Sequence, residues 1–267
     1  MKVDVLNLEG KKTKTLDLPI QFDEEYRPDL IKRAVLSIQS NNRQPYGANV
    51  RAGKDYSAKL SRRRRKYKTA YGKGISRVPR KTVWHRGTQF GWVGALSPGT
   101  VGGRRAHPPK AVKEWSKKLN IKERRKAIRS AIASTIDKEL VKSRGHLYNN
   151  VPIIFENKLE ELSKTKDIIF VMKNIGLSDE LNRLKIKKVR VGKGKNRGRK
   201  YNTKIGPLIV VSDSCKLQKV ALNIQGIDIV KVKNLNAELL SPGTNPGRLV
   251  IWTEKAIERL AKESLFI

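Results

Sequence analysis

The chain has 267 residues, of which 59 are Lys or Arg and 24 are Asp or Glu, so its formal net charge is +35 at pH 7. A compact body with this charge would repel itself, which excludes an ordinary solvated globule and indicates a polyanionic partner, either nucleic acid or an anionic membrane. Hydrophobic residues make up 38% of the chain, enough for a core in part of it.

The single cysteine, Cys215, excludes an intramolecular disulfide and every multi-cysteine zinc pattern. The first ten residues have no apolar run typical of a signal peptide, and no stretch approaches the roughly 18 apolar residues of a membrane-spanning helix. We therefore expect a cytoplasmic protein.

The first 42 residues have the pattern of an ordinary globular surface, because they hold 7 basic and 7 acidic side chains. Residues 3–8 are expected to form a short strand. Residues 29–39 are expected to form a helix, since Pro28 and Asp29 are favoured in a first helical turn and apolar residues recur at helical spacing.

The next segment, residues 43–110, is strongly basic and has almost no helical or strand periodicity. It holds 18 Lys and Arg against the single acid Asp55, together with 10 of the 20 glycines and 5 of the 11 prolines. It also holds 7 of the 16 aromatic residues, whereas disordered tails are poor in aromatics. We expect a long irregular basic loop whose rings stack or pack against a partner.

Arginines with interleaved tyrosines are the main motif of this first basic segment. The guanidinium fork pairs with phosphate and stacks on bases, so the motif favours contact with irregular RNA, although a solvated charge run or a targeting signal is the alternative. The predicted RNA contacts here are Arg51, Arg62, Arg63, Arg64, Arg65, Lys66, Tyr67, Lys68, Tyr71, Lys73, Arg77, Arg80, Lys81, Arg86, Arg104, Arg105 and His107.

Strand and helix patterns alternate through the rest of the chain. We expect strands over residues 151–155, 207–211, 227–232 and 248–252, and helices over 120–144, 163–175, 236–240 and 254–265, with a further helix starting at Ser178. Asn120 is the expected N-cap of the longest helix and Gly145 its stop. The alternation predicts an α/β fold, a layered globular domain with a largely parallel sheet flanked by helices.

A second basic segment, residues 183–204, holds 11 Lys and Arg and no acid. Its glycines at 192, 194 and 198 match neither the dinucleotide fingerprint nor a phosphate-binding loop. Contact with a phosphate backbone is favoured over a surface loop that is merely basic. The predicted RNA contacts here are Lys185, Lys187, Lys188, Arg190, Lys193, Lys195, Arg197, Arg199 and Lys200.

Catalytic patterns are weak in this chain. His85, His107 and His146 are scattered and are expected to stack or hydrogen-bond in an RNA interface, and Cys215 is expected to be a small buried thiol. We expect no enzyme activity, no catalytic residue, no metal site and no cofactor. An RNA-modifying enzyme and a DNA- or membrane-associated basic protein stay open as alternatives.

The tryptophans divide into two expected groups. Trp84 and Trp92 lie in a glycine-rich stretch with almost no aliphatic residues, which indicates a tip that is exposed or packed against RNA. Trp115 and Trp252 lie at positions that predict burial.

Several motifs resemble the ribosomal protein L-four family of the large subunit, in its archaeal and eukaryotic form. They are Arg51-Ala52-Gly53, Gly72-Lys73-Gly74, Arg77-Val78-Pro79-Arg80, the run from Gly102 to Pro109, and the terminal runs Asn234-Leu235-Asn236-Ala237-Glu238-Leu239-Leu240-Ser241-Pro242-Gly243-Thr244, Pro246-Gly247-Arg248-Leu249 and Ile251-Trp252-Thr253-Glu254. The resemblance covers nearly the whole chain.

The resemblance implies a structural constituent of the large ribosomal subunit that helps its assembly, with a non-ribosomal RNA-binding or RNA-modifying protein as the alternative. Residues 1–42 and 111–267 would form the globular α/β domain, residues 43–110 an RNA-penetrating loop inserted in it, and residues 183–204 a second basic extension. The implied partners are large-subunit rRNA, neighbouring large-subunit proteins and the nascent peptide at the loop tip, which would line the exit tunnel. The tip candidates are Trp84, His85, Arg86, Gln89, Phe90 and Trp92, in a stretch bulkier and more aromatic than the family's arginine-rich tip.

Overall fold

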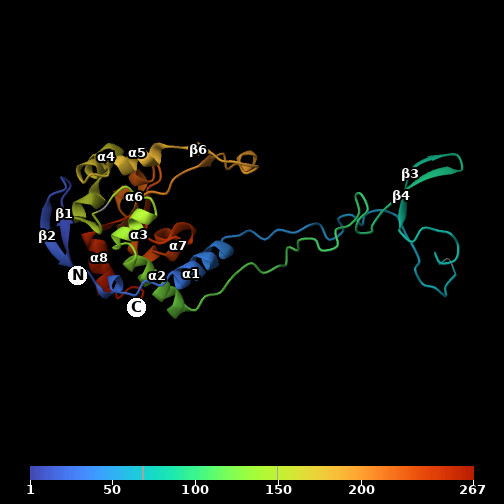
Figure 1. The fold of residues 1–267 in the computed structure, drawn as a ribbon, viewed down its shortest axis with the longest axis horizontal. Coiled ribbons are helices and arrows are strands. Elements are labelled where there is room, and N and C mark those ends of the chain that lie inside the picture. The colour runs from blue at the N-terminus through green and yellow to red at the C-terminus, as the bar shows by residue number, and fades with distance from the viewer. Residues whose placement is uncertain (68, 149) are drawn as a thin grey trace. The chain divides into compact units, whose positions relative to one another are not determined.

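The computed structural model describes residues 1–67, 69–148 and 150–267 (Figure 1). The chain forms two units. The globular unit comprises Met1–Asn42 and Ser116–Ile267, and the loop unit comprises Arg43–Trp115.

A six-stranded sheet forms the centre of the globular unit. Its strands, in spatial order, are β2 (Lys12–Asp17), β1 (Lys2–Leu6), β5 (Ile153–Phe155), β10 (Val250–Thr253), β8 (Leu208–Val211) and β9 (Asp228–Lys231). Only the β1–β2 pair is antiparallel, and the other four pairs are parallel. The largely parallel sheet expected from the alternating pattern is therefore confirmed.

Helices cover both faces of this sheet, as Figure 1 shows for the globular unit. The helices are α1 (Pro28–Asn41), α2 (Ile121–Ala133), α3 (Lys138–Ser143), α4 (Thr165–Asn174), α5 (Ser178–Lys185), α6 (Lys216–Ala221), α7 (Ala237–Leu240) and α8 (Glu254–Lys262). Short 3-10 turns cover Ile20–Phe22, Asn157–Glu161, Lys195–Arg197, Val232–Asn234 and Pro242–Thr244. None of the helices in the described ranges is both long and apolar enough to cross a membrane.

Alternate residues of the central strands enter two separate cores. Val210 and Trp252 pack with residues of α1, α2, α7 and α8, whereas Ile209 and Ile251 pack with residues of α3, α4, α5 and α6. Because side chains alternate across a strand, covering both faces requires apolar residues at successive positions, as in all of β8 and the first three residues of β10. The predicted burial of Trp252 is confirmed, and its ring meets Phe22 edge-on at 5.2 Å.

The expected single helix over residues 120–144 is wrong, because the structure breaks it into α2 and α3. The hydroxyls of Ser134 and Thr135 donate to the carbonyls of Ala131 and Ile132, both at 2.7 Å, and Asp137 accepts from the first amides of α3. These local bonds compete with continued helix. Asn120 occupies the N-cap position without a side-chain capping bond.

Apart from two short strands in the second basic segment, two elements of the globular unit were not predicted. In β2 nearly every side chain is exposed. Its lysines and threonines alternate without forming an apolar face, so the pattern does not indicate a strand. Helix α6 has only six residues, fewer than a periodicity can establish. β2 is specified by its pairing with β1, and α6 by its packing against the sheet.

The loop unit contains a β-hairpin, so the expectation of an irregular segment throughout residues 43–110 is wrong. Strands β3 (Arg80–Arg86) and β4 (Gln89–Gly94) pair antiparallel through a two-residue turn. A bulge between Thr82 and Trp84 shifts the register and interrupts the alternation that would have predicted the strand. At its base, the Ala95 amide donates to the Pro79 carbonyl at 2.7 Å.

Candidate nucleic-acid interface

The two ends of the loop unit run side by side. The Ala48 amide donates to the Pro109 carbonyl at 2.9 Å, and Gly47 lies against the Ala111 backbone. Further along, Gly53 lies against Gly103 and Arg104. The motifs around Gly53 and Arg104, fifty residues apart in the sequence, therefore meet in space.

Gly53 is required for this contact in two ways. Its φ of +73° is in the left-handed region, and a Cβ atom there would lie 2.5 Å from the Arg104 amide nitrogen. The close approach places the backbone of Arg104 against the segment that carries Arg51. Arg51 also forms an ion pair with Asp55 at 3.1 Å.

Aromatic rings hold several cations of the loop unit. The guanidinium groups of Arg64 and Arg77 lie 5.5 and 4.9 Å from the centroid of the Tyr71 ring, and the ammonium group of Lys81 lies 3.6 Å from that of Tyr56. Such contacts are attractive because a ring face carries negative charge. The sequence predicted rings for bases to stack on, and the structure adds that these rings orient the cations.

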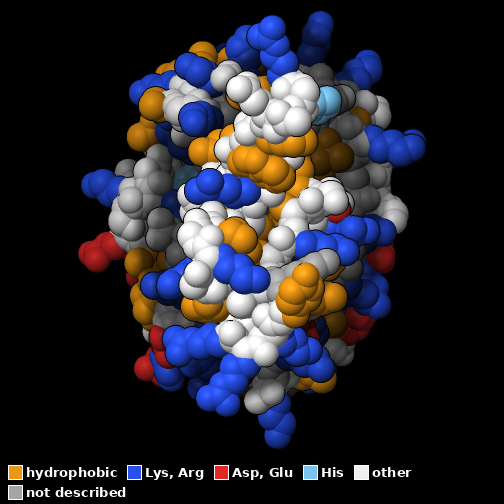
Figure 2. Space-filling view, turned by 90° about the vertical axis from the view of Figure 1, so that its right-hand side faces the viewer, with side chains coloured by type: hydrophobic (Ala, Val, Ile, Leu, Met, Phe, Trp, Pro, Cys, Tyr) orange, Lys and Arg blue, Asp and Glu red, His pale blue; other side chains and the backbone are white. Residues whose placement is uncertain are grey.

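Most of the predicted RNA contacts in the loop unit are exposed. Tyr71, Lys81 and Arg104 are half-buried, and Lys68 lies outside the described residues. The exposed ones are Arg51, Arg62, Arg63, Arg64, Arg65, Lys66, Tyr67, Lys73, Arg77, Arg80, Arg86, Arg105 and His107. Figure 2 shows one face of the molecule on which Lys, Arg and hydrophobic side chains predominate.

The hairpin divides the tip candidates between its two faces. His85, Phe90 and Trp92 form a chain of rings, with centroid separations of 6.0 and 5.9 Å. On the other face, the Trp84 indole covers Gly91, and Arg86 pairs with Gln89 beside the turn. The expected exposure of the two tryptophans is confirmed, with 56% of Trp84 and 53% of Trp92 accessible.

The predicted burial of Trp115 is wrong, since this residue is half-buried in the loop unit. Its ring stacks on Tyr46 at 5.5 Å, and the charged groups of Arg43 and Lys113 lie 5.1 and 4.3 Å from its centroid. Trp115 lies outside any helix or strand, because the next helix begins only at Ile121. Arg43 and Lys113 were not among the predicted contacts, and no local motif identifies them.

The second basic segment forms a small hairpin of β6 (Lys188–Val189) and β7 (Tyr201–Asn202). Arg190 fastens its strands, because its amide donates to the Lys200 carbonyl at 2.8 Å and its Nε to the Arg199 carbonyl at 3.2 Å. The predicted contacts in this segment are all exposed, from Lys185 to Lys200.

A buried carboxylate anchors the root of this second hairpin. Glu180 accepts from Arg183 at 2.5 and 2.8 Å, and Arg183 also donates to the Ile205 carbonyl at 2.8 Å, at the far end of the segment. His146 Nδ1 lies 2.7 Å from Glu180 and the Leu147 amide donates to it at 3.1 Å. Burial alone would raise the pKa of Glu180, but the bonds from His146, Arg183 and Leu147 outweigh it and lower the pKa to about 2.

The expectation that His146 belongs to an RNA interface is therefore wrong. Its side chain is buried against Glu180 inside the globular unit. No acid near it in sequence indicated this pairing, because Glu180 lies 34 residues away.

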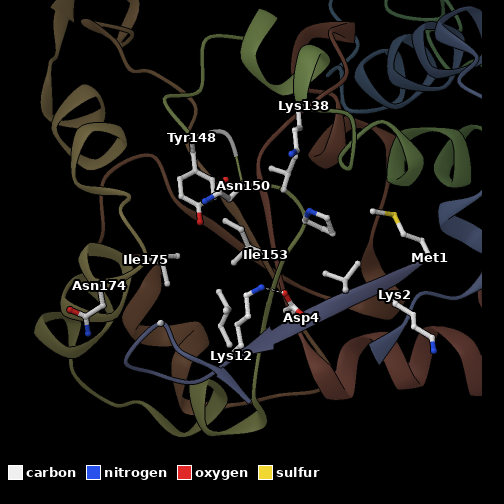
Figure 3. A pocket seen from close by; sticks show the side chains of 15 residues that line it. Met1, Lys2, Asp4, Lys12, Lys138, Tyr148, Asn150, Ile153, Asn174 and Ile175 are labelled. Carbon is white, nitrogen blue, oxygen red and sulfur yellow. Dashed lines mark ion pairs between the residues drawn. The ribbon is translucent and has the colours of Figure 1, made fainter. Parts of the chain in front are cut away.

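A cleft lies beside β1, and Figure 3 shows the side chains that line it. It has a volume of about 630 Å³ and is lined mainly by lysine, amide and aliphatic side chains. Its carboxylate, Asp4, pairs with Lys12 at 2.5 Å, and burial raises the pKa of Tyr148. Asp4 is the one carboxylate among the lining residues and is paired with a lysine, and the lining includes no histidine.

The described residues include neither a cluster of metal ligands nor a reactive thiol. Its His, Cys, Asp and Glu side chains form no group of three that could hold a metal ion. Cys215 is half-buried at the start of α6 rather than fully buried as expected, and burial raises the pKa of its thiol. A raised pKa disfavours the nucleophilic thiolate.

Comparison with known proteins gives full-length similarity to one family. Residues 16–263 match the model of the ribosomal protein L4/L1 family. Relatives named large ribosomal subunit protein uL4 include those of Nanoarchaeum equitans, 50% identical over all of both chains, and Archaeoglobus fulgidus, 46% identical over 98% of this chain and 99% of the relative. The relative from Methanocaldococcus jannaschii is 46% identical over 97% and 98% of the two chains.

Replacing Gly53 with Ala should separate the two ends of the loop unit. Spin labels on cysteines at positions 49 and 107, in a Cys215→Ser background, report the distance between them by pulsed electron resonance. We expect Gly53→Ala to broaden the distance distribution. Gly99→Ala is the matched control, because Gly99 has a similar φ of +87° with open space around it. A narrow distribution in both variants would contradict the packing role of Gly53.

Acid should weaken the anchor at Glu180. Its pKa is lowered from 4.5 unfolded to about 2 folded, so the stabilisation is present above pH 4.5 and is lost as the pH falls toward 2. In urea unfolding, Glu180→Gln should lower the free energy of unfolding at pH 7 by roughly 2–3 kcal/mol, with a smaller difference at pH 3. Asp179→Asn, at the exposed neighbour, should follow the wild type. An unchanging difference across this pH range would contradict the linkage.

Proposed function

The chain belongs to the ribosomal protein L4/L1 family, and on this premise we propose that it is a structural protein of the large ribosomal subunit that binds large-subunit rRNA. The relatives reported above are named as proteins of the large ribosomal subunit, and this chain matches them over almost their full length. Its site of action is then the cytoplasmic ribosome, beside neighbouring proteins of the large subunit.

The concentration of exposed cations in the loop unit carries the proposal. The 73 residues from Arg43 to Trp115 hold only two acids, Asp55 and Glu114, beside nineteen Lys and Arg. Cations that are not neutralised within the chain repel one another and attract phosphate. Each Lys or Arg that meets a phosphate releases a counterion, which contributes favourable free energy at low salt.

The form of the loop unit suits folded RNA better than a DNA groove or a membrane surface. Its backbone is extended and glycine-rich, and its cations are distributed along paired strands and aromatic contacts rather than along a helix. DNA-reading helices and basic amphipathic helices both need regular helical spacing. Extended basic backbone with exposed rings matches the irregular surfaces and unstacked bases of RNA.

The β3–β4 hairpin is proposed to line the peptide exit tunnel. Its exposed rings, Trp84, Phe90 and Trp92, lie on both of its faces. One face can then pack against RNA while the other meets the nascent peptide. A paired hairpin holds these rings in fixed positions, as a narrow passage requires.

The second basic hairpin is proposed to bind rRNA as an extension of the globular unit. Its nine predicted contacts are exposed, and the Glu180–Arg183 anchor fixes both of its ends. The buried anchor leaves the cations of the hairpin available, since Arg183 alone of the segment pairs with Glu180.

Charge reversal tests the rRNA interface. Arg63→Glu with Arg64→Glu should lower the affinity for large-subunit rRNA by about tenfold at 0.1 M salt and reduce the dependence on salt by about two phosphate contacts. Filter binding over a salt series measures both quantities. The control reverses Lys216 and Lys255, which are exposed in the globular unit. Equal losses in the two double variants would contradict a localised interface.

Removal of the β3–β4 hairpin tests whether this hairpin contacts the nascent peptide while the rest of the chain binds rRNA. Deleting residues 80–94 and joining Pro79 to Ala95 uses two residues already linked by a hydrogen bond. We expect the variant to sediment with large subunits as well as the wild type does, while cross-linking of stalled nascent peptides to this protein is lost. Failure to enter the particle would contradict the assignment of rRNA docking to the rest of the chain.

A further inference from the structure

A groove on the globular unit is lined by residues of α4, α5 and the turn that follows α6. Figure 1 shows α5 beside the start of the second basic hairpin. The volume of the groove is about 680 Å³, within the range of sites that bind small organic groups. Of the residues that line the groove, only Leu184 and Lys185 belong to a basic segment, at the start of the second one. The lining side chains are apolar at the base and amide or lysine at the rim.

The apolar base of the groove is Ile169, Leu181, Leu184 and Ile224. Leu184 is held closely by backbone, because a Cβ atom on Gly206 would lie 2.5 Å from its Cδ1. The base of the groove is therefore fixed by packing and does not depend on a ligand.

The rim of the groove is polar, and its charged side chains are all cationic. Lys173 and Lys185 line it, no acid does, and Lys185 Nζ donates to the Asn182 amide oxygen at 3.4 Å. Asn223 and Gln225 add further amides. Within the described residues the Gln225 Nε2 is buried and has no hydrogen-bond partner, a state that a ligand acceptor would relieve.

We propose that this groove binds one unpaired nucleotide of RNA, which rests on the proposed function of the chain as an rRNA-binding protein. The base would lie on the apolar side chains, the amides of Gln225 and Asn223 would meet its polar edge, and the two lysines would meet the flanking phosphates. Unpaired RNA bases are recognised through apolar contact combined with hydrogen bonds to their edges.

Continuity of charge favours RNA over an acidic peptide as the occupant. Lys185 ends α5 and begins a run of lysines and arginines without an acid that continues to Lys204. A polynucleotide bound along this run would pass the groove at Lys185. The apolar base with amides beside it suits a heterocycle, whereas Lys173 and Lys185 are the only cations among the lining residues, too few for a run of carboxylates.

The test uses the full chain with labelled isoleucine methyl groups and single-stranded RNA hexamers of each base as probes. Saturable shifts of the Ile169 and Ile224 methyl signals are expected with at least one hexamer. Lys173→Glu should weaken the binding that these methyl groups report by about fivefold. Lys166→Glu, on the same helix but outside the groove, should weaken it less than about twofold.

Filter binding of large-subunit rRNA to the same samples separates the two proposals. If rRNA binds and the hexamers leave both methyl signals unmoved, the groove proposal is wrong and the rRNA proposal stands. If an acidic Glu- and Leu-rich peptide moves them and RNA does not, the occupant is a protein and the groove proposal is again wrong. If rRNA does not bind at all, both proposals are wrong.

Discussion

Unequal compensation of positive charge is the constraint on which the rest of this structure depends. In the globular unit, several buried or half-buried cations have acidic partners, such as Arg248 with Asp228 and Arg129 with Glu24, whereas Arg144 donates to the carbonyls of Pro242 and Asn245. Burial lowers the pKa of Arg248, and Asp228 opposes that effect. The loop unit has almost no acids, so its cations cannot be neutralised from within. One part of the chain therefore folds by burying apolar surface, whereas the other carries charge that an external polyanion, such as the rRNA proposed above, would neutralise.

The basic segments are nevertheless ordered by specific local contacts. Where acids are missing, close backbone packing at Gly53 and rings such as Tyr71 keep cations apart and in place. Where the second basic hairpin leaves the globular unit, Glu180 fixes Arg183 at its base. Such contacts reduce the conformational entropy that binding would otherwise remove, so more of the phosphate attraction appears as affinity.

The sequence predicted most of the globular elements because strands such as β8 and β10 are continuously apolar and helices such as α1 are strongly periodic. It failed where local bonds or short elements overrode the pattern. The hydroxyl groups of Ser134 and Thr135 end α2 early, β2 is exposed on both faces, and a bulge conceals the alternation of β3. The conditions that defeated the pattern were thus short length, full exposure and side-chain bonds to the backbone.

By itself, the sequence predicted a polyanionic partner, because the charge and its distribution along the chain follow from the order of the residues. It also determined the layered α/β class, since periodicity depends only on neighbouring residues. Tertiary structure alone decided which distant residues meet: Glu180 with His146, Gly53 with Arg104, and the Trp115 ring with Arg43 and Tyr46. These pairings arise from the folded path of the backbone, which brings together residues whose separation in sequence carries no periodic signal.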